Sequence, residues 1–319
     1  MHQKPMPAEP LITIGLPVFN AERFLADAFD SILAQTYSGF KLVVSDNGST
    51  DSTAKIVEGY ANRDRRIAFI RNSYNRGATW NFNRVFAECR TRYFKWAAAD
   101  DMLAPTLLER SLEMLENSPA TVVLVYPQTL LIDASGETVG LVKDTLAAPP
   151  GAAPHVRLLR VVRNMEYGNT AFSLLRSDAL RHTRLLGSFP SADHVLLGEL
   201  ALTGEFREMP EPLFLRRIHE GISVRANANA ESITHWFDPQ RAPVRRRRLT
   251  IFREQLRGIH SAQLSARERA LVYLFYLEAS AEGPLRDWVG VRTRLRGAWG
   301  KISRLPRGGE RRGSKQHLS

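Results

Sequence analysis

Carboxylate side chains stand at two places where short apolar runs end. Asp46 follows the run FKLVVS, and the doublet Asp100-Asp101 follows residues 93–97. Two adjacent carboxylates repel each other, so a pair that points into a cleft normally has a cation nearby, and oxygen ligands of this kind suit Mg²⁺ or Mn²⁺. The competing interpretation is that Asp101 caps a helix that begins near Ala104, while Asp100 is solvated. The position at the end of a strand, beside other polar loops, favours a metal site.

The segment DNGSTD, which begins at Asp46, can be explained in part without any ligand. Its composition is typical of a turn that leads into a helix, and capping explains Ser49, Thr50 or Asp51. Capping does not explain Asp46, which lies one residue past a strand and several residues before the helix. A carboxylate in that place could accept a hydrogen bond from a nucleobase or a ribose.

Strand-like apolar runs alternate with segments of helical periodicity in the first part of the chain. The predicted strands cover residues 11–16, 40–45, 67–71, 93–97 and 121–132, and the predicted helices cover residues 21–35, 52–61, 80–89 and 104–116. This alternation predicts an α/β protein with a parallel, doubly wound sheet and helices on both faces. In such a sheet ligands bind beyond the carboxyl ends of the strands, which is where the polar loops stand.

The rest of the chain has a weaker pattern. We expect helices at residues 155–165, 192–203, 244–259, 267–281 and 285–302, a strand at 168–175, and strands interrupted by prolines within 205–218. The segment 133–189 is otherwise hard to assign. Residues 306–319 are polar and basic, and we expect them to be disordered.

Several classes of protein are excluded. A dinucleotide-binding dehydrogenase needs G-x-G-x-x-G after its first strand, whereas this chain has GLPVFN, in which Pro17 removes a backbone donor. There is no Walker A motif and no indication of a Ser-His-Asp nucleophile. The single cysteine, Cys89, excludes a disulfide framework and a cysteine-based zinc site. Without a signal peptide or a spanning apolar run, we expect a cytoplasmic protein.

Four segments that occur in order carry a family resemblance: LPVFNAERFLADAFDSILAQTY, VVSDNGSTDST, DRRIAFIRNSYNRG and KWAAADDML. Together they closely resemble family 2 glycosyltransferases, which are inverting, nucleotide-sugar-dependent enzymes with the GT-A fold. The resemblance covers about Leu11–Arg225. It implies a Rossmann-like, mostly parallel sheet with helices on both faces, followed here by a C-terminal helical extension.

The same resemblance implies the division into domains. Residues 1–225 would form the GT-A catalytic domain, with a nucleotide-binding half at about 11–132 and an acceptor half at about 133–225. Beyond the resemblance, the change to helices with Arg-rich faces predicts a basic helical extension at residues 226–305, and the polar, basic end predicts a disordered tail at residues 306–319.

The resemblance also implies roles for the polar loops. The residues that would border or bind the nucleotide sugar are Pro17, Val18, Asn20, Glu22, Asp46, Asn47, Arg76 and Asp100. Asp46 would contact the base, Arg76 would lie near the base or the diphosphate, and Asp100 would lie near the ribose and the sugar. Asp101 would be the direct ligand of a divalent cation, Mn²⁺ or Mg²⁺. Many relatives have D-x-D-D here, whereas this chain begins with Ala98, which leaves the identity and the affinity of the metal open.

Two later segments complete the implied site. An inverting transfer needs a general base, which the family presents at the start of a helix, and Asp193 before VLLGELALTG fits that place. The alternatives are that Asp193 only caps its helix or that His194 is the base. Arg217 and His219 resemble the family's late R-x-H element, so His219 would complete the metal shell or contact the diphosphate, and Arg217 would help to neutralise the leaving group.

The positive charge of the chain is concentrated near its end. The formal net charge is +11, and residues 241–319 carry 19 Lys and Arg against 6 Asp and Glu. Helices with Arg-rich faces in this part could simply pack on the catalytic domain, dock on an anionic membrane at the inner face, or bind a protein partner. No nucleic acid is expected, because no recognisable binding motif is present.

These observations predict a metal-assisted inverting glycosyltransferase with Asp193 as the general base. Its partners would be a nucleotide-diphosphate sugar and an acceptor that carries a hydroxyl group. The alternative is a non-catalytic nucleotide-sugar-binding or scaffold protein that works through its basic tail. A nucleotidyltransferase is a weaker option, because the Gly- and Arg/Lys-rich loop expected after its first strand is missing.

Overall fold

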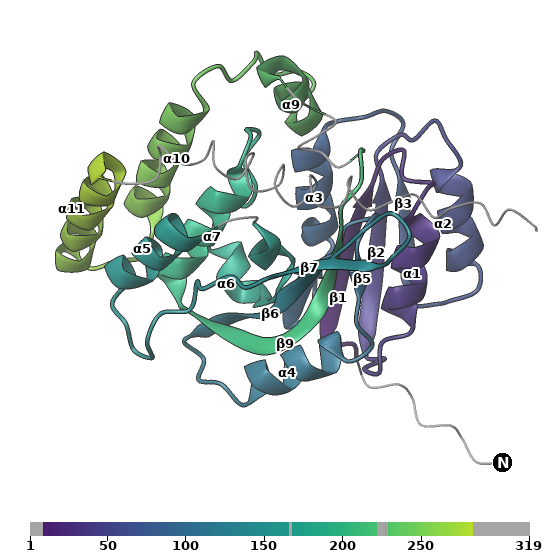
Figure 1. Cartoon of the computed structure of the whole chain (residues 1–319), viewed down its shortest axis with the longest axis horizontal. Coiled ribbons are helices and arrows are strands. Elements are labelled where there is room, and N and C mark those ends of the chain that lie inside the picture. The colour runs from purple at the N-terminus through teal and green to yellow at the C-terminus, as the bar shows by residue number, and fades with distance from the viewer. Residues whose placement is uncertain (1–8, 166–167, 222–226, 228, 283–319) are drawn as a thin grey trace, which may run out of the picture. The chain divides into compact units, whose positions relative to one another are not determined.

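The computed structural model describes residues 9–165, 168–221, 227 and 229–282. They form an α/β fold around one sheet of nine strands, in the order β3-β2-β1-β4-β8-β6-β9-β5, with β7 paired to β6 (Figure 1). The strands are β1 (Ile12–Val18), β2 (Phe40–Asp46), β3 (Ile67–Arg71), β4 (Tyr93–Trp96), β5 (Met102–Leu103), β6 (Val122–Ile132), β7 (Thr138–Val142), β8 (Leu174–Arg176) and β9 (Glu205–Arg217).

The first part of the sheet is parallel, as predicted. β1 pairs in parallel with both β2 and β4, and β2 pairs in parallel with β3. Every residue of β1 is buried, because a central parallel strand is covered on both faces and so consists of apolar residues almost throughout. The carboxyl ends of these strands meet at one edge, which brings the loops after β1, β2 and β4 together.

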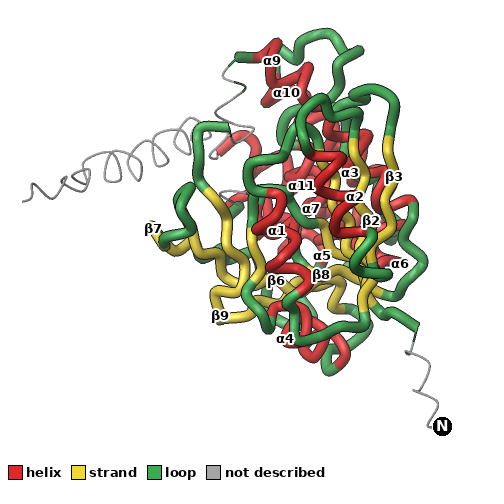
Figure 2. The backbone as a smooth tube through the Cα atoms, turned by 90° about the vertical axis from the view of Figure 1, so that its right-hand side faces the viewer, coloured by secondary structure: helices red, strands yellow, loops and turns green. Residues whose placement is uncertain are grey.

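The second part of the sheet is mixed. β8 lies antiparallel between β4 and β6, while β6 and β9 run parallel to each other. Short β5 is antiparallel to β9, and the hairpin partner β7, at the periphery in Figure 2, is antiparallel to β6. β6 therefore points the same way as β4, and the expected mostly parallel sheet is confirmed.

Helices cover both faces of this sheet, as predicted. One hydrophobic cluster lies under α1 (Leu25–Leu33), α2 (Thr53–Ala61) and α4 (Leu107–Glu116). A second cluster lies under α3 (Ala78–Ala87), α5 (Pro154–Asn164), α6 (Ser177–Arg181) and α7 (Ala192–Thr203). The predicted helices 21–35 and 80–89 are confirmed with shorter or shifted ends.

The middle of the chain differs from the sequence-based expectation. The strand expected at 168–175 begins instead as the 3₁₀ helix η1 (Asn169–Phe172), and only the short β8 is extended. Gly168 precedes η1 with φ +67, a conformation that favours glycine. β7, α6 and α9 (Ala230–Phe237) were not predicted, because each is short and has little periodicity.

The expected interruption in 205–218 is present, although the segment forms one long strand. Glu205–Met209 and Phe214–Arg217 pair with β6, and the register shifts between them, where Pro210 and Pro212 stand. Because proline has no N–H to donate, the ladder breaks at this point.

The helical extension packs on the helices that cover one face of the sheet. α10 (Arg247–Ser261) contacts α7, and α11 (Ala266–Glu282) contacts both α5 and α10, so these helices lie side by side in Figure 1. The described residues from 9 to 282 belong to one compact unit. The predicted helix 285–302 and tail 306–319 lie outside the described residues. The division at residue 225 and the docking of the extension on a membrane stay predictions.

No helix in the part of the chain that the structure describes is long and apolar enough to cross a membrane.

Candidate functional site

The loops that follow β1 and β2 are joined by side-chain to backbone hydrogen bonds. Asn20, at φ +45, accepts a bond at Oδ1 from the backbone N of Thr50 at 2.9 Å. Oε2 of Glu22 accepts one from the backbone N of Ser52, also at 2.9 Å. In the opposite direction, the backbone N of Asn20 donates to Oγ of Ser49. The structure therefore brings Asn20 and Glu22 together with DNGSTD, and it uses their side chains to hold the two loops.

Asp46 ends β2, where it is fully buried beside Val18 of β1. Its Oδ1 accepts hydrogen bonds from both the backbone N and the hydroxyl of Ser49. Its Oδ2 lies 3.8 Å from Nε of Arg71 and has no hydrogen-bond partner among the described residues. A buried carboxylate oxygen of this kind is costly unless a donor reaches it, and a bound base could supply that donor.

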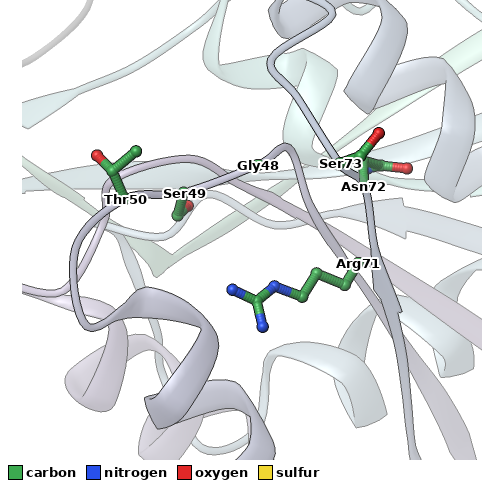
Figure 3. A pocket seen from close by; sticks show the side chains of 6 residues that line it. All are labelled: Gly48, Ser49, Thr50, Arg71, Asn72 and Ser73. Carbon is green, nitrogen blue, oxygen red and sulfur yellow. The ribbon is translucent and has the colours of Figure 1, made fainter.

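A pocket opens beside this carboxylate, at the ends of β2 and β3. It is lined by Gly48, Ser49, Thr50, Arg71, Asn72 and Ser73. The side chain of Arg71 extends towards the loop of Gly48, Ser49 and Thr50 (Figure 3). Gly48 is required there, because its φ is +76 and a Cβ atom would stand 2.7 Å from the backbone of Tyr74. None of these six lining residues was predicted as a site residue, although Gly48, Ser49 and Thr50 directly follow Asp46 and Asn47.

Asn47 and Arg76 lie on the loop that leads into α3. The side chain of Asn47 donates to Oδ1 of Asn75 and accepts from the backbone N of Arg76. The guanidinium of Arg76 stacks 4.6 Å from the ring centre of Trp80 and donates to the hydroxyl of Tyr74. Asn47 is thus buried and shapes the loop, while Arg76 is exposed at its surface.

Asp100, Asp101 and His219 form a cluster where the loop after β4 meets the end of β9. Nε2 of His219 lies 3.0 Å from Oδ2 of Asp100, and Oδ1 of Asp101 accepts from the backbone N of Arg217 at 2.9 Å. Burial, and then the neighbouring charge of Asp100, raise the pKa of Asp101 well above its usual range. Two carboxylates and an imidazole are therefore assembled from positions more than 100 residues apart.

Lys95, which was not predicted as a site residue, lies buried in β4, where its charge interacts with that of Asp101. Its ammonium group donates to the carbonyl of Phe172 and lies 5.4 Å from the ring centre of Phe214. Burial lowers the pKa of Lys95 to about 7, and the negative charge of Asp101 opposes that shift. A lysine inside an apolar strand can be recognised in the sequence KWAAADD, but only the fold shows which charge it faces.

The donor set fits a divalent cation that is held jointly with a substrate. Within the described residues, no group of three or more His, Cys, Asp or Glu side chains is placed to hold a metal. Mg²⁺ and Mn²⁺ commonly use one or two carboxylates together with water and substrate phosphates, so the paired Asp100 and Asp101 satisfy that requirement. Burial and the charge of Asp100 raise the pKa of Asp101, although the positive charges of Arg216 and Lys95 oppose the rise.

Asp193 stands in the first turn of α7, against the loop before η1. A Cβ atom at Gly168 would lie 2.1 Å from Oδ2 of Asp193, so only glycine leaves room for this carboxylate. Burial raises the pKa of Asp193, and the charges of Arg247 and Arg216 oppose the rise. The same burial, and then Arg247, lower the pKa of His194 well below its usual value. A neutral imidazole and a carboxylate of raised pKa are both compatible with proton transfer.

Arg216 and Arg217 have different surroundings. Arg217 is 2% exposed, and its guanidinium donates to the carbonyl of Asp100 at 3.0 Å and to Oδ2 of Asp27 at 2.9 Å. Arg216 contacts Oδ1 of Asn169, and its charge acts on both Asp101 and Asp193. Arg216 was not predicted as a site residue, yet its charge acts on both the acidic pair and Asp193.

Residues 13–129 match the family model described as Glycosyl transferase family 2. The chain carries a family 2 glycosyltransferase domain. Two curated relatives are named as uncharacterized glycosyltransferases. That of Rickettsia typhi is 31% identical over 42% of this chain and 41% of its own length, and that of Haemophilus influenzae is 25% identical over 66% of each.

Solved structures support the GT-A fold that the resemblance implied. S. aureus TarS 1–349 in complex with UDP-GlcNAc superposes with a TM-score of 0.62 at 14% identity, over 87% of this chain and 74% of TarS 1–349. The mannosyltransferase PcManGT of Pyrobaculum calidifontis, in complex with GDP-Man and Mn²⁺, has a TM-score of 0.52 at 15% identity, over 93% and 88%. The predicted family and GT-A fold of the glycosyltransferase domain are confirmed. The chain spans between two fifths and two thirds of the length of the two curated relatives.

Proposed function

We propose that this chain is an inverting glycosyltransferase that moves a sugar from a nucleotide-diphosphate sugar to an acceptor hydroxyl. The observation that carries the proposal is the single edge of the sheet at which Asp46, the pair Asp100-Asp101 and the end of β9 meet. Transfer from a nucleotide-diphosphate sugar needs a pocket for the nucleobase, a counter-charge for the phosphates and a group that takes the proton of the attacking hydroxyl. Asp193, linked to the acidic pair through Arg216, supplies the third.

The nucleoside would bind at the pocket beside the end of β2. Oδ2 of Asp46 has no hydrogen-bond partner among the described residues, so a base with a ring N–H would satisfy it. Uracil and guanine have such a donor, whereas adenine and cytosine do not. TarS binds UDP-GlcNAc and PcManGT binds GDP-Man, which agrees with this choice of bases.

A bound Mn²⁺ or Mg²⁺ would neutralise the diphosphate as it leaves. Asp101 would hold it, and His219 would support the site through Asp100. Nδ1 of His219 accepts from the backbone N of Gly221 at 3.2 Å, which leaves the ring proton on Nε2, where it donates to Asp100. His219 therefore orients the carboxylate of Asp100 in this tautomer. Arg216 would add positive charge beside the phosphates.

Asp193 would take the proton of the attacking hydroxyl. Its position at the start of α7, against Gly168, places a carboxylate beside Arg216 without a covering side chain at residue 168. With the diphosphate bound on the acidic pair, the acceptor would approach from the side of Asp193, and attack would invert the anomeric carbon.

Calorimetry with UDP, GDP, dTDP, ADP and CDP, each with and without Mn²⁺, tests the donor site. We expect UDP, GDP or dTDP to bind, with an affinity that Mn²⁺ raises at least tenfold. Asp101→Asn should abolish the effect of Mn²⁺, while Asp178→Asn, an exposed carboxylate on α6, should leave it unchanged. Equal binding of all five nucleotides, or an intact Mn²⁺ effect in Asp101→Asn, would contradict the assignment.

Turnover separates this proposal from a non-catalytic sugar-nucleotide binder. Release of UDP from UDP-GlcNAc, or of GDP from GDP-Man, would be followed with Mn²⁺ and mixed acceptor glycans. A catalyst releases nucleotide in the wild type, and Asp193→Asn stops the release without weakening donor binding. Donor binding with no release in either protein would favour the scaffold alternative.

A further inference from the structure

The C-terminal extension is fitted closely against the helix that bears Asp193. A Cβ atom at Gly198 of α7 would stand 2.4 Å from the side chain of Gln255 of α10, and one at Gly258 would stand 2.8 Å from Glu199. Each helix thus has a glycine where the other inserts a side chain. Contact this close fixes the position of α10 along α7.

An ion-pair network at the same contact joins the two helices. The guanidinium of Arg184 lies 2.6 Å from Oε1 of Glu199 and 3.0 Å from Oε2 of Glu254, and it also donates to the carbonyl of Glu254. Glu199 is nearly buried, so its pairing with Arg184 is less screened than a surface pair would be. α7 and α10 therefore behave as one packed element.

The extension also reaches the nucleotide-binding half. Gly77, next to Arg76, has a φ of +88, and a Cβ atom there would stand 2.5 Å from the carbonyl oxygen of Phe237 and 2.7 Å from Pro239. The segment after α9 therefore lies against the loop that leads into α3, as the position of α9 above α3 in Figure 1 illustrates. Together with α10, it borders the site from two sides.

Arg247, at the first turn of α10, extends to the start of α7. Its guanidinium donates to Oγ of Ser191, the N-cap residue of α7, which has a φ of +68. Nearby, Arg241 donates to the carbonyl of Ser188 at 2.8 Å. Arg247 is exposed as a whole residue, but its guanidinium contacts Ser191, which is two positions before Asp193 in the sequence.

In the part of the chain that the structure describes, three charged or titratable groups lie near the carboxylate of Asp193. They are Arg247 of α10, Arg216 of β9 and His194, which follows Asp193 in α7. Burial of the His194 ring favours its neutral form. The charge of Arg216 acts on Asp101 as well as on Asp193, so Arg216 does not serve Asp193 alone. Among the described residues, Arg247 is the guanidinium of the C-terminal extension that acts on Asp193.

We propose that Arg247 is a positioning residue for the general base: it holds Ser191 at the start of α7 and keeps the carboxylate of Asp193 ionised. This inference rests on the proposed role of Asp193. The extension then contributes to the candidate active site, because at least one arginine of its basic segment contacts the start of α7. A mere structural anchor would hold α10 on α7 without changing the ionisation of Asp193.

The test measures that ionisation directly, without a substrate. The full chain, labelled with ¹³C at the aspartate carboxyl carbons, is titrated by NMR, and Asp193→Asn identifies the resonance of Asp193. In Arg247→Met the apparent pKa of Asp193 should rise by about one pH unit or more, because an opposite charge at close range lowers a carboxyl pKa by about 1–3. Arg247→Lys should restore most of it. Arg253→Met, an exposed arginine of the same helix, should match the wild type.

Activity provides the second readout. If Asp193 is the base, the acidic limb of the rate of UDP-GlcNAc or GDP-Man turnover should move to higher pH in Arg247→Met and recover at alkaline pH. An unchanged Asp193 titration in a folded Arg247→Met variant would overturn the inference. A shifted titration with full activity in Asp193→Asn would instead overturn the role of Asp193 as base, and with it the catalytic meaning of Arg247.

Discussion

The loops that follow β1 and β2 place their polar groups differently from the start of α7. In the loops, the bonds from Thr50 to Asn20 and from Ser52 to Glu22 join positions 30 residues apart, within neighbouring strand–helix units. At α7 and the acidic pair, partners come from 56 residues away for Arg247 and Ser191, and from 119 for His219 and Asp100. The first region is a local motif, whereas the second is assembled by the whole fold.

This difference explains which site residues can be recognised from sequence motifs. A local motif carries its own partners, so its residues can be recognised together. A site assembled from distant segments shows only isolated residues in the sequence, such as Lys95 or Arg247, and their roles depend on packing. Substitutions in the two regions should therefore differ in what they disturb, and the following predictions test that contrast.

The largest effect is expected at the assembled region. Asp193→Asn should lower the rate of sugar transfer by about 10²–10⁴-fold, because a positioned general base contributes about that much. Binding of the nucleotide, which depends on the local loops, should stay within about twofold of the wild type. Asp178→Asn, whose side chain is 88% exposed, is the control and should retain full activity. A parallel loss of donor affinity would show that the two regions are not separable.

A backbone test concerns the contact between the two regions. Gly77→Ala should lower the free energy of unfolding by about 3 kcal/mol, because left-handed strain adds to the clash with Phe237 and Pro239. Gly136→Ala has the same kind of strain at φ +90, but a Cβ atom there would have no heavy atom of the described residues within 4 Å apart from its chain neighbours. We therefore expect Gly136→Ala to lower the free energy of unfolding by only about 1 kcal/mol. Urea denaturation measures both. Equal losses would mean that the segment after α9 does not rest on the loop.

A pH test concerns Lys95, at the border of the two regions. Its pKa is about 7 in the folded protein against 10.5 normally, so between these values the unfolded chain binds more protons and wild-type stability should rise with pH. The stability difference between the wild type and Lys95→Met should change by about 3 kcal/mol between pH 6.5 and 9.5, in favour of the wild type at the higher pH. The exposed Lys41→Met should show no such trend. A pH-independent difference for Lys95→Met would refute the buried, depressed lysine.

The smallest effect is expected in the local loops. Glu22→Gln should reduce the free energy of unfolding by about 0.5–1 kcal/mol, because the amide still accepts from Ser52 but lacks a charge at the start of α2. Glu58→Gln, on the exposed side of the same helix, should change stability by less than about 0.5 kcal/mol. Thermal denaturation at low salt would compare the two. A loss of several kcal/mol in Glu22→Gln would show that this loop is less self-contained than its short-range bonds indicate.

The sequence predicted the first half of the fold well. The strands up to β4, and β6, were placed within two residues, because buried parallel strands are uniformly apolar and their helices have a clear period. The pattern was weaker after Ile132, where strands are short and antiparallel and η1 replaces the start of a predicted strand. Short elements have too few residues to show a period, so their form depends on tertiary contacts.

The candidate site divides in the same way. The sequence identified Asp46, the pair Asp100-Asp101 and the start of α7, because each follows a recognisable strand or precedes a recognisable helix. It could not show that Arg217 would be buried against Asp27 while Arg216 faced the acidic pair. Adjacent residues of a strand point to opposite faces, and only the register of β9 against β5 and β6 decides which guanidinium reaches the site.

The sequence by itself determined the family, the α/β architecture and the polar ends of the strands, since periodicity and local motifs are properties of neighbouring residues. The tertiary structure decided which of these groups share an edge, and it placed one arginine of the basic extension, Arg247, against the start of α7. The positive charge near the end of the chain does not distinguish an arginine that faces solvent from one that faces Asp193. Charge is a property of composition, but its effect on a carboxylate depends on distance and burial, which only the packing of α10 on α7 sets.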